Sequence, residues 1–275
     1  MTAPQRWTVN RATAGARAVD FAELWSYREL VLFLALRDVK ARYKQAVFGV
    51  GWAVLQPLIG AAMLTFVFSR VASVPSDGVP YPVFSLLGIT VWNYFTASLG
   101  GATHSLVSNA SLVTKVYFPR VLAPLAALVP PLVALAIGLV LTGVAMAIYG
   151  LAPSPALLAV PVCVLAVMGV SFGIGLLLAT INVRYRDVGQ IFGLLTQMWL
   201  FASPVAYPSS QVTGAWRWAY SLNPMAGVLD AFRWALLGIP ADWGAMAVSA
   251  GVGILLLGGG LRAFQRGERQ FADLI

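Results

Sequence analysis

Uncharged stretches divide the sequence into long apolar segments separated by short charged ones. No Asp, Glu, Lys or Arg occurs within five windows, which are residues 45–69, 78–114, 121–183, 188–216 and 243–261. A helix needs about 20 largely apolar residues to cross the hydrocarbon core of a membrane. The longest window is split by the turn sequence YGLAPSP at 149–155, because Gly and Pro interrupt helices. The pattern predicts an all-α integral membrane protein with spans at about residues 46–69, 82–105, 122–149, 156–182, 189–206 and 243–261.

The segment before the first predicted span has the pattern of a helix that lies in the membrane interface. Residues 22–45 place apolar side chains three and four residues apart, on one helix face. Such a helix turns its apolar stripe toward the bilayer and its charges toward water. The apolar residues are Trp25, Leu32, Leu36, Val39 and Tyr43, and the basic ones include Arg37, Lys40, Arg42 and Lys44. We expect a flexible cytoplasmic tail at residues 1–21 and a second cytoplasmic tail at residues 266–275, on either side of a membrane domain that spans residues 22–265.

Two connecting segments also have helical patterns. SNASLVTKVYFPR at 108–120 predicts a short amphipathic helix between spans two and three, which is either a connector on the surface or a docking element for a partner. Between spans five and six, residues 225–239 predict a helix with Asp230 and Arg233 one turn apart. Carrying both charges through lipid costs several kcal/mol, so we expect interfacial or re-entrant helices here. In span four, Gly169, Gly173 and Gly175 have the spacing that favours close helix packing.

Composition and charge give the class of protein and its orientation. Hydrophobic residues make up 59% of the chain and charged residues 10%, against about 25% charged in soluble domains. Of the 18 Lys and Arg residues, 15 lie on the side of the predicted spans that carries both termini. Short cytoplasmic loops carry an excess of Lys and Arg, so we predict that both termini are cytoplasmic. The net charge of +8 then indicates a basic collar beside anionic lipid and not a nucleic-acid site.

Several kinds of site are missing from the sequence. No Lys follows a Gly, so the chain lacks the Gly-Lys-Ser/Thr motif of phosphate-binding loops. The single histidine, His104, and the single cysteine, Cys163, do not provide a paired-His or multi-Cys metal site. The predicted spans contain no Asp or Glu, which argues against an ion-coupled carrier and against a membrane transferase. We therefore expect no metal or cofactor in this chain, which would form a membrane pathway and take its energy from elsewhere.

Polar and aromatic side chains in the spans have two interpretations that the sequence leaves open. Gln56, beside Pro57 in span one, either hydrogen-bonds a neighbouring helix or lines a pathway. The dense aromatic residues either form an interfacial belt and pack ordinarily, or provide ring faces along which sugars slide.

The order of five segments resembles that of permeases of polysaccharide-exporting ABC transporters, the type-2 export permeases for O-antigen, teichoic acid or related glycans. The resemblance covers about residues 22–265 and rests on LRDVKARYKQAVFGVGWAVLQPL, NASLVTKVYFPRVLAPLA, INVRYRDV, SPVAYP and SLNPMAGVLDAFRWALLG. It implies a homodimer bound to two copies of a separate ATPase, which would bind ATP and Mg²⁺. It also implies six spans per protomer, an interface helix, a coupling helix at 109–120 and short outer gate helices.

The resemblance also implies roles for individual residues. The contact with the ATPase would use Asn109, Lys115, Tyr117, Arg120, Arg184, Arg186 and Asp187. The basic end of the interface helix, with Arg37, Lys40, Arg42 and Lys44, would attract the pyrophosphate of an undecaprenyl carrier. Spans one and five of both protomers would line the channel with Trp52, Gln56, Gln197, Trp199, Phe201 and Tyr207.

The implied function is export of a polyprenyl-pyrophosphate-linked polysaccharide across a bacterial plasma membrane. The glycan would be of the O-antigen, teichoic acid or cell-wall galactan type, and the partners would be the ATPase, a second copy and membrane lipids. Export of a small lipid or drug by the same kind of permease is the alternative. An ion-coupled carrier or membrane transferase is the third hypothesis, and it predicts activity without an ATPase.

Overall fold

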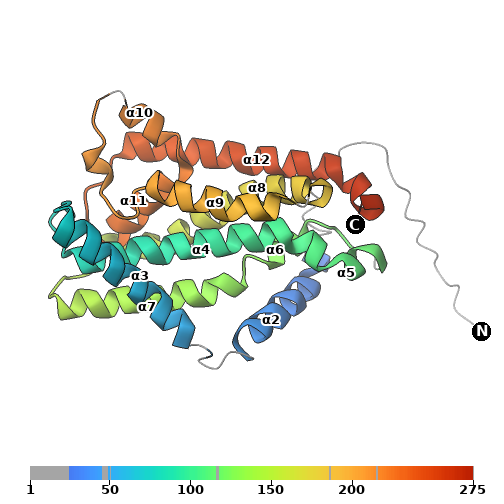
Figure 1. The fold of residues 1–275 in the computed structure, drawn as a ribbon, viewed down its shortest axis with the longest axis horizontal. Coiled ribbons are helices and arrows are strands. Elements are labelled where there is room, and N and C mark those ends of the chain that lie inside the picture. Colours follow the sequence, from blue (N-terminus) through green and yellow to red (C-terminus); the bar gives the residue numbers. More distant parts are fainter. Residues whose placement is uncertain are drawn as a thin grey trace, which may run out of the picture.

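The computed structural model describes residues 25–44, 49, 51–115, 118–185, 187–214 and 216–274, and within these ranges every regular element is a helix. The helices run mostly along one long axis (Figure 1). Their bounds are α2 (Arg28–Lys44), α3 (Gly51–Leu64), η1 (Thr65–Val71), α4 (Tyr81–Ser108), α5 (Ala110–Lys115), α6 (Leu122–Ala126), α7 (Pro130–Ile148), η2 (Pro155–Ala159), α8 (Val160–Arg184), α9 (Val188–Phe201), η3 (Ser209–Gln211), α10 (Trp216–Ser221), α11 (Pro224–Leu237) and α12 (Trp243–Leu274).

The all-α prediction is confirmed, and five helical segments are long and apolar enough to cross a membrane. They are Gly51–Val71, Tyr81–Ser108, Leu122–Ile148, Pro155–Arg184 and Trp243–Glu268. The segment predicted as span five, residues 189–206, is instead a shorter apolar helix, α9, which ends at Phe201. At 14 residues it is about 21 Å long. Pro204 explains the early end, because the residue before a proline is biased away from helical geometry. Six full-length spans are therefore not confirmed.

Two ends of the bundle can be distinguished in Figure 1. The α5 end carries α2, α5, α6 and the last turns of α12, and the α11 end carries α10 and α11. Described basic residues at the α5 end include Arg37, Lys40, Arg42, Lys44, Lys115, Arg120, Arg184 and Arg266, whereas Arg70, Arg217 and Arg233 belong to the α11 end. The charge asymmetry expected from the sequence is thus an asymmetry between the two ends of the fold.

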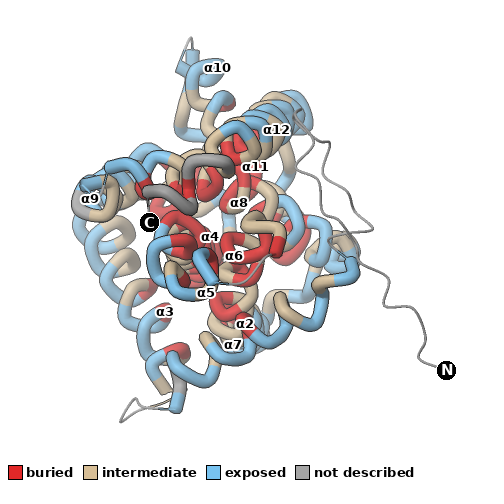
Figure 2. The backbone as a smooth tube through the Cα atoms, turned by 90° about the vertical axis from the view of Figure 1, so that its right-hand side faces the viewer, coloured by how far each residue is buried: buried red, intermediate tan, exposed pale blue. Residues whose placement is uncertain are grey.

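The core lies along α4, which forms the centre of the bundle (Figure 2). Most of α4 is buried, and α8 packs extensively against both α4 and α12. In contrast, α3 and α12 bury only a small part of their apolar surface. In α2 the buried residues are Leu34 and Ala35, while the predicted apolar stripe residues Leu32 and Leu36 are exposed. Leu32 and Leu36 are therefore available to lipid, and the face of α2 with Leu34 and Ala35 packs on the bundle.

Small residues permit the close contacts of α8. A Cβ atom added at Gly173 would lie 2.6 Å from the Cα of Leu257 in α12, and one added at Gly175 would lie 2.6 Å from the Cβ of Ala102 in α4. Gly260 of α12 faces the carbonyl of Gly173. The close packing expected at Gly173 and Gly175 is confirmed, whereas Gly169 has open space around it.

The α11 end is closed by the predicted helix with its Asp230–Arg233 pair. Arg233 is 2% exposed, its guanidinium lies 3.8 Å from the ring centroid of Phe84 in α4, and its Nη2 donates to the carbonyl of Val205 at 3.3 Å. Its Nη1 lies 3.6 Å from Oδ1 of Asp230. Burial raises the pKa of the Asp230 carboxyl, and the charge of Arg233 offsets part of that shift. One cation thus joins α4, α11 and the segment after α9.

We predict that Gly173→Ala destabilises the fold because the added methyl group meets backbone atoms of α12. Overpacking of this kind costs about 1–3 kcal/mol, so the thermal unfolding temperature in detergent should fall by several degrees. Gly169→Ala is the matched control in the same helix, where nothing lies within 4 Å, and it should leave that temperature unchanged or slightly raised. Equal destabilisation by both changes would contradict the contact between α8 and α12.

Candidate functional site

The predicted coupling segment begins at a buried asparagine that connects three helices. Asn109 follows the last residue of α4, and its Nδ2 donates to the carbonyl of Ser105 at 2.8 Å. Its Oδ1 accepts a hydrogen bond from Nη2 of Arg37 in α2, also at 2.8 Å. The start of α5 is therefore fixed both to α4 and to the interface helix. Asn109, which was predicted to contact the ATPase, and Arg37, which was predicted to attract pyrophosphate, are direct hydrogen-bond partners.

The other side of the coupling segment is fixed to the last turns of α12. The backbone N–H of Arg120 donates to Oε1 of Glu268 at 3.3 Å, and its guanidinium donates to the backbone carbonyl of Glu268. Val113 of α5 and Phe118 belong to one buried apolar cluster with Phe264 and Phe271 of α12. A displacement of α5 would therefore be transmitted to α12 through both polar and apolar contacts.

The last turns of α12, which ends at Leu274, form most of the segment predicted as a cytoplasmic tail at residues 266–275. The helix has 32 residues, which corresponds to about 48 Å against a hydrocarbon core of about 30 Å. Its last turns therefore extend beyond a bilayer, and Phe271 is only 2% exposed. The spacing of Phe264 and Phe271, two helical turns apart, was the signal that could have identified this packed extension.

The other described charged residues expected at the partner contact or on the interface helix are exposed. Lys115, Arg184 and Asp187 are exposed at the α5 end, as are Lys40, Arg42 and Lys44 on α2. Tyr117 and Arg186 lie outside the described residues. A short helix whose inner face is fixed and whose outer face carries free positive charge is suited to dock against an acidic or polar partner.

His104, near the α5 end of α4, packs against other helices. Its ring meets the ring of Phe192 in α9 edge to face at 6.5 Å, and its Nδ1 lies 3.4 Å from Nδ2 of Asn182 in α8. This arrangement agrees with a packing role and joins α4 to both neighbours.

The residues predicted to line a channel fall into exposed and packed groups. Trp52 and Gln56 on α3 are exposed, as are Gln197 and Phe201 on α9, with 51% of Trp52 and 59% of Phe201 accessible. Both helices pack against α4, and Figure 2 places them on the same side of the bundle. Their apolar and polar outer faces form a surface on which a second protein copy or an elongated substrate can lie.

Trp199 packs against aromatic side chains of α4. Its ring makes edge-to-face contacts with Trp92 and Phe95 of α4, at 6.5 Å and 5.2 Å between centroids. Its Nε1 donates to Oδ1 of Asn223 at 3.1 Å, and Asn223 also caps α11 by accepting from the N–H of Met225. The ordinary packing interpretation of the aromatic residues is therefore the better one for Trp199.

Tyr207 is half-buried at the α11 end. Its hydroxyl donates to the carbonyl of Phe201 at 3.0 Å and accepts from the hydroxyl of Tyr220 at 3.3 Å. These contacts hold the segment after α9 in place beside α10.

Comparison with known proteins assigns this arrangement to a family. Residues 29–237 match the family model described as ABC-2 type transporter. The chain is 30% identical to the O-antigen export system permease protein RfbA of Myxococcus xanthus over 258 residues, which cover 92% of this chain and 98% of the relative. It is 25% identical to the protein of the same name from Klebsiella pneumoniae over 248 residues, covering 90% and 95%. The matched region includes α2, α5, α9 and α11, so the chain belongs to the ABC-2 type transporter family.

Proposed function

We propose that this chain is the membrane permease of an ATP-driven exporter that moves a polyprenyl-pyrophosphate-linked polysaccharide out of the cytoplasm. The observation that carries the proposal is the near full-length similarity to permeases named for O-antigen export. O-antigen, teichoic acid and cell-wall galactan are the classes of glycan that we include. The chain would lie in a bacterial plasma membrane with the α5 end and both termini in the cytoplasm, since that end carries most of the Lys and Arg.

The energy would come from a separate ATPase that binds ATP and Mg²⁺. The free outer face of α5, with Lys115, is the docking element in this proposal, and Arg184 and Asp187 extend the contact. Movement of the ATPase would reach the spans through Arg120 and Glu268, because these residues join the coupling segment to α12. Two ATPase copies would act on two permease copies.

The permease would work as a homodimer with a channel between the two copies. The support is the uncovered apolar surface of α3 and α9, in which Ile59, Met63, Leu194 and Met198 are all exposed. A second copy would bury part of this surface, and α9 with the turns after it would complete a sixth crossing. Trp52 and Gln56 would then offer a ring face and an amide to passing sugars.

We predict that Lys115→Glu weakens docking of the ATPase, because it reverses the charge of an exposed side chain on α5. Close charge pairs between proteins couple by about 1.5–7 kcal/mol, so the ATPase recovered with the purified permease should fall roughly tenfold or more. Arg70→Glu is the control at the other end of the bundle, where Arg70 is also exposed, and it should leave recovery unchanged.

An equal loss with Arg70→Glu would indicate a general effect of charge and would remove α5 as the docking element. Full recovery of the ATPase with Lys115→Glu would have the same consequence.

We predict that Trp52→Ala and Gln56→Ala each lower the amount of glycan that reaches the cell surface while leaving the dimer intact. Loss of one hydrogen bond worth about 1 kcal/mol corresponds to a roughly fivefold effect at Gln56. Leu255→Ala on α12, where the side chain is 74% exposed, is the control on a surface assigned to lipid. Unchanged export in both α3 variants would show that this face of α3 is not channel wall.

A further inference from the structure

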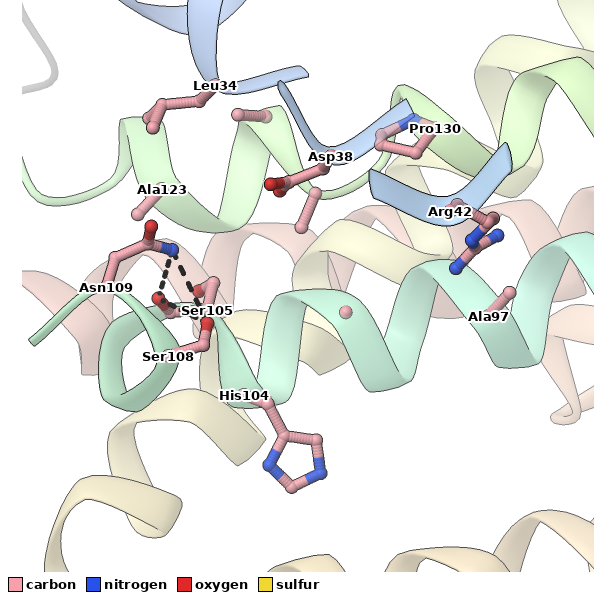
Figure 3. Close-up of a pocket in the computed structure, with 13 residues that line it drawn as sticks. Leu34, Asp38, Arg42, Ala97, His104, Ser105, Ser108, Asn109, Ala123 and Pro130 are labelled. Carbon is pink, nitrogen blue, oxygen red and sulfur yellow. Dashed lines mark hydrogen bonds between the residues drawn. The ribbon is translucent and has the colours of Figure 1, made fainter. Parts of the chain in front are cut away.

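A cavity separates the interface helix from the helices behind it. It lies between α2 and the ends of α4, α6 and α7, and its volume is about 180 Å³ (Figure 3). Its walls include the small residues Ala97, Gly101, Ala123 and Ala126, which leave space that larger side chains would fill. The cavity is therefore built from the sequences of several helices and is not a gap at one loose segment.

Two opposite charges face this cavity without meeting each other. Asp38 and Arg42 lie four residues apart on α2, and both line the cavity. Opposite charges at this spacing usually attract across one helical turn. Here Oδ1 of Asp38 is bonded to Arg37 at 2.8 Å. No ion pair or hydrogen bond joins Arg42 to the residues that the structure describes. Figure 3 shows the side chain of Arg42 extending from α2 toward α4, while the carboxylate of Asp38 points away from Arg42.

The polar lining also includes the titratable ring of His104 and three uncharged side chains. Ser105, Ser108 and Asn109 line one end of the cavity. Ser105 and Ser108 donate their hydroxyl hydrogens to carbonyl groups of α4, at 2.8 Å and 3.2 Å. Their oxygens retain lone pairs, so they can accept hydrogen bonds from a cationic group. A ligand with both a cation and an anion could therefore bind in this cavity. Its cation would contact Asp38 and the serine oxygens, and its anion would contact Arg42.

We propose that the cavity binds the headgroup of a zwitterionic phospholipid, with its ammonium at Asp38 and its phosphate at Arg42. The exposed stripe on α2 with Leu32 and Leu36 would lie in the same leaflet as the acyl chains. A lipid held there would bridge α2 to α4, beside the Arg37–Asn109 contact at the start of α5.

The carboxylate of Asp38 distinguishes this ligand from other phosphate compounds in the membrane. A pyrophosphate carrier or an anionic lipid brings negative charge without a cation for the Asp38 carboxylate, which lines the cavity beside Arg37. The proposal requires only the membrane-spanning fold. It does not depend on the exported substrate, so it can fail while the export proposal stands, and the reverse is also possible.

The test is native mass spectrometry of the full-length permease, released from nanodiscs that contain equal amounts of phosphatidylethanolamine and phosphatidylglycerol. Wild-type protein should retain phosphatidylethanolamine in preference to phosphatidylglycerol. Arg42→Ala should reduce that retention roughly tenfold, as expected when a charged contact is lost. Asp38→Asn should abolish the preference between the two lipids. Arg28→Ala is the matched control, because Arg28 is exposed on the same helix and does not line the cavity.

Three results would overturn the proposal. They are equal retention of the two lipids by wild-type protein, an equal loss with Arg28→Ala and Arg42→Ala, and displacement of phosphatidylethanolamine by added polyprenyl pyrophosphate. The last result would reassign the cavity to a pyrophosphate carrier. Gel filtration and thermal unfolding of each variant would establish that its fold is unchanged.

Discussion

The close approach of α8 to α4 and α12 is the contact on which the rest of the structure depends. Gly173, Gly175 and Gly260 allow backbones to meet where any larger residue would separate them. In a bilayer, helix association relies on such van der Waals packing, because lipid tails are as apolar as the side chains. With α8 fixed in this way, α12 runs beside it past the edge of the bilayer. Its last turns then reach the coupling segment.

This arrangement separates a rigid scaffold from surfaces that remain open. The helices α4 and α8 hold the core, while α3 and α9 cover one side of it and keep much of their apolar surface exposed. The two ends are closed differently. The α11 end is held by the buried Arg233 against Phe84, and the α5 end by Glu268 and the Phe264–Phe271 pair. The helix α5 is thus firmly connected to α12.

Much of this fold could be predicted from the sequence because a bilayer excludes charge. The uncharged windows located the long helices, and the turn YGLAPSP divided the longest window at the right place. The helix with Asp230 and Arg233 was also expected, since a charged pair does not suit a span. The length of α9 was missed, because apolar composition alone does not show that Pro204 ends the helix before it crosses the membrane.

The contacts that build the candidate site could not be predicted in the same way. Arg120 and Glu268 are far apart in the sequence, as are Arg37 and Asn109, and no local pattern specifies such pairings. The assignment of Trp199 to packing similarly depends on Trp92 and Phe95 of α4 and on Asn223 before α11, which lie far from Trp199 in the sequence or in another helix. Lys115, Lys40 and Lys44 were correctly expected at the surface, since lysine is rarely buried.

The most direct test of the account is mass spectrometry of lipid-linked intermediates in cells depleted of this protein. The account predicts that a long glycan on a polyprenyl-pyrophosphate carrier accumulates, because synthesis continues after export has stopped. The same spectra would identify the glycan. Unchanged lipid-linked glycans, together with a shift in another lipid or in a secreted small molecule, would contradict polysaccharide export and support the small-substrate alternative.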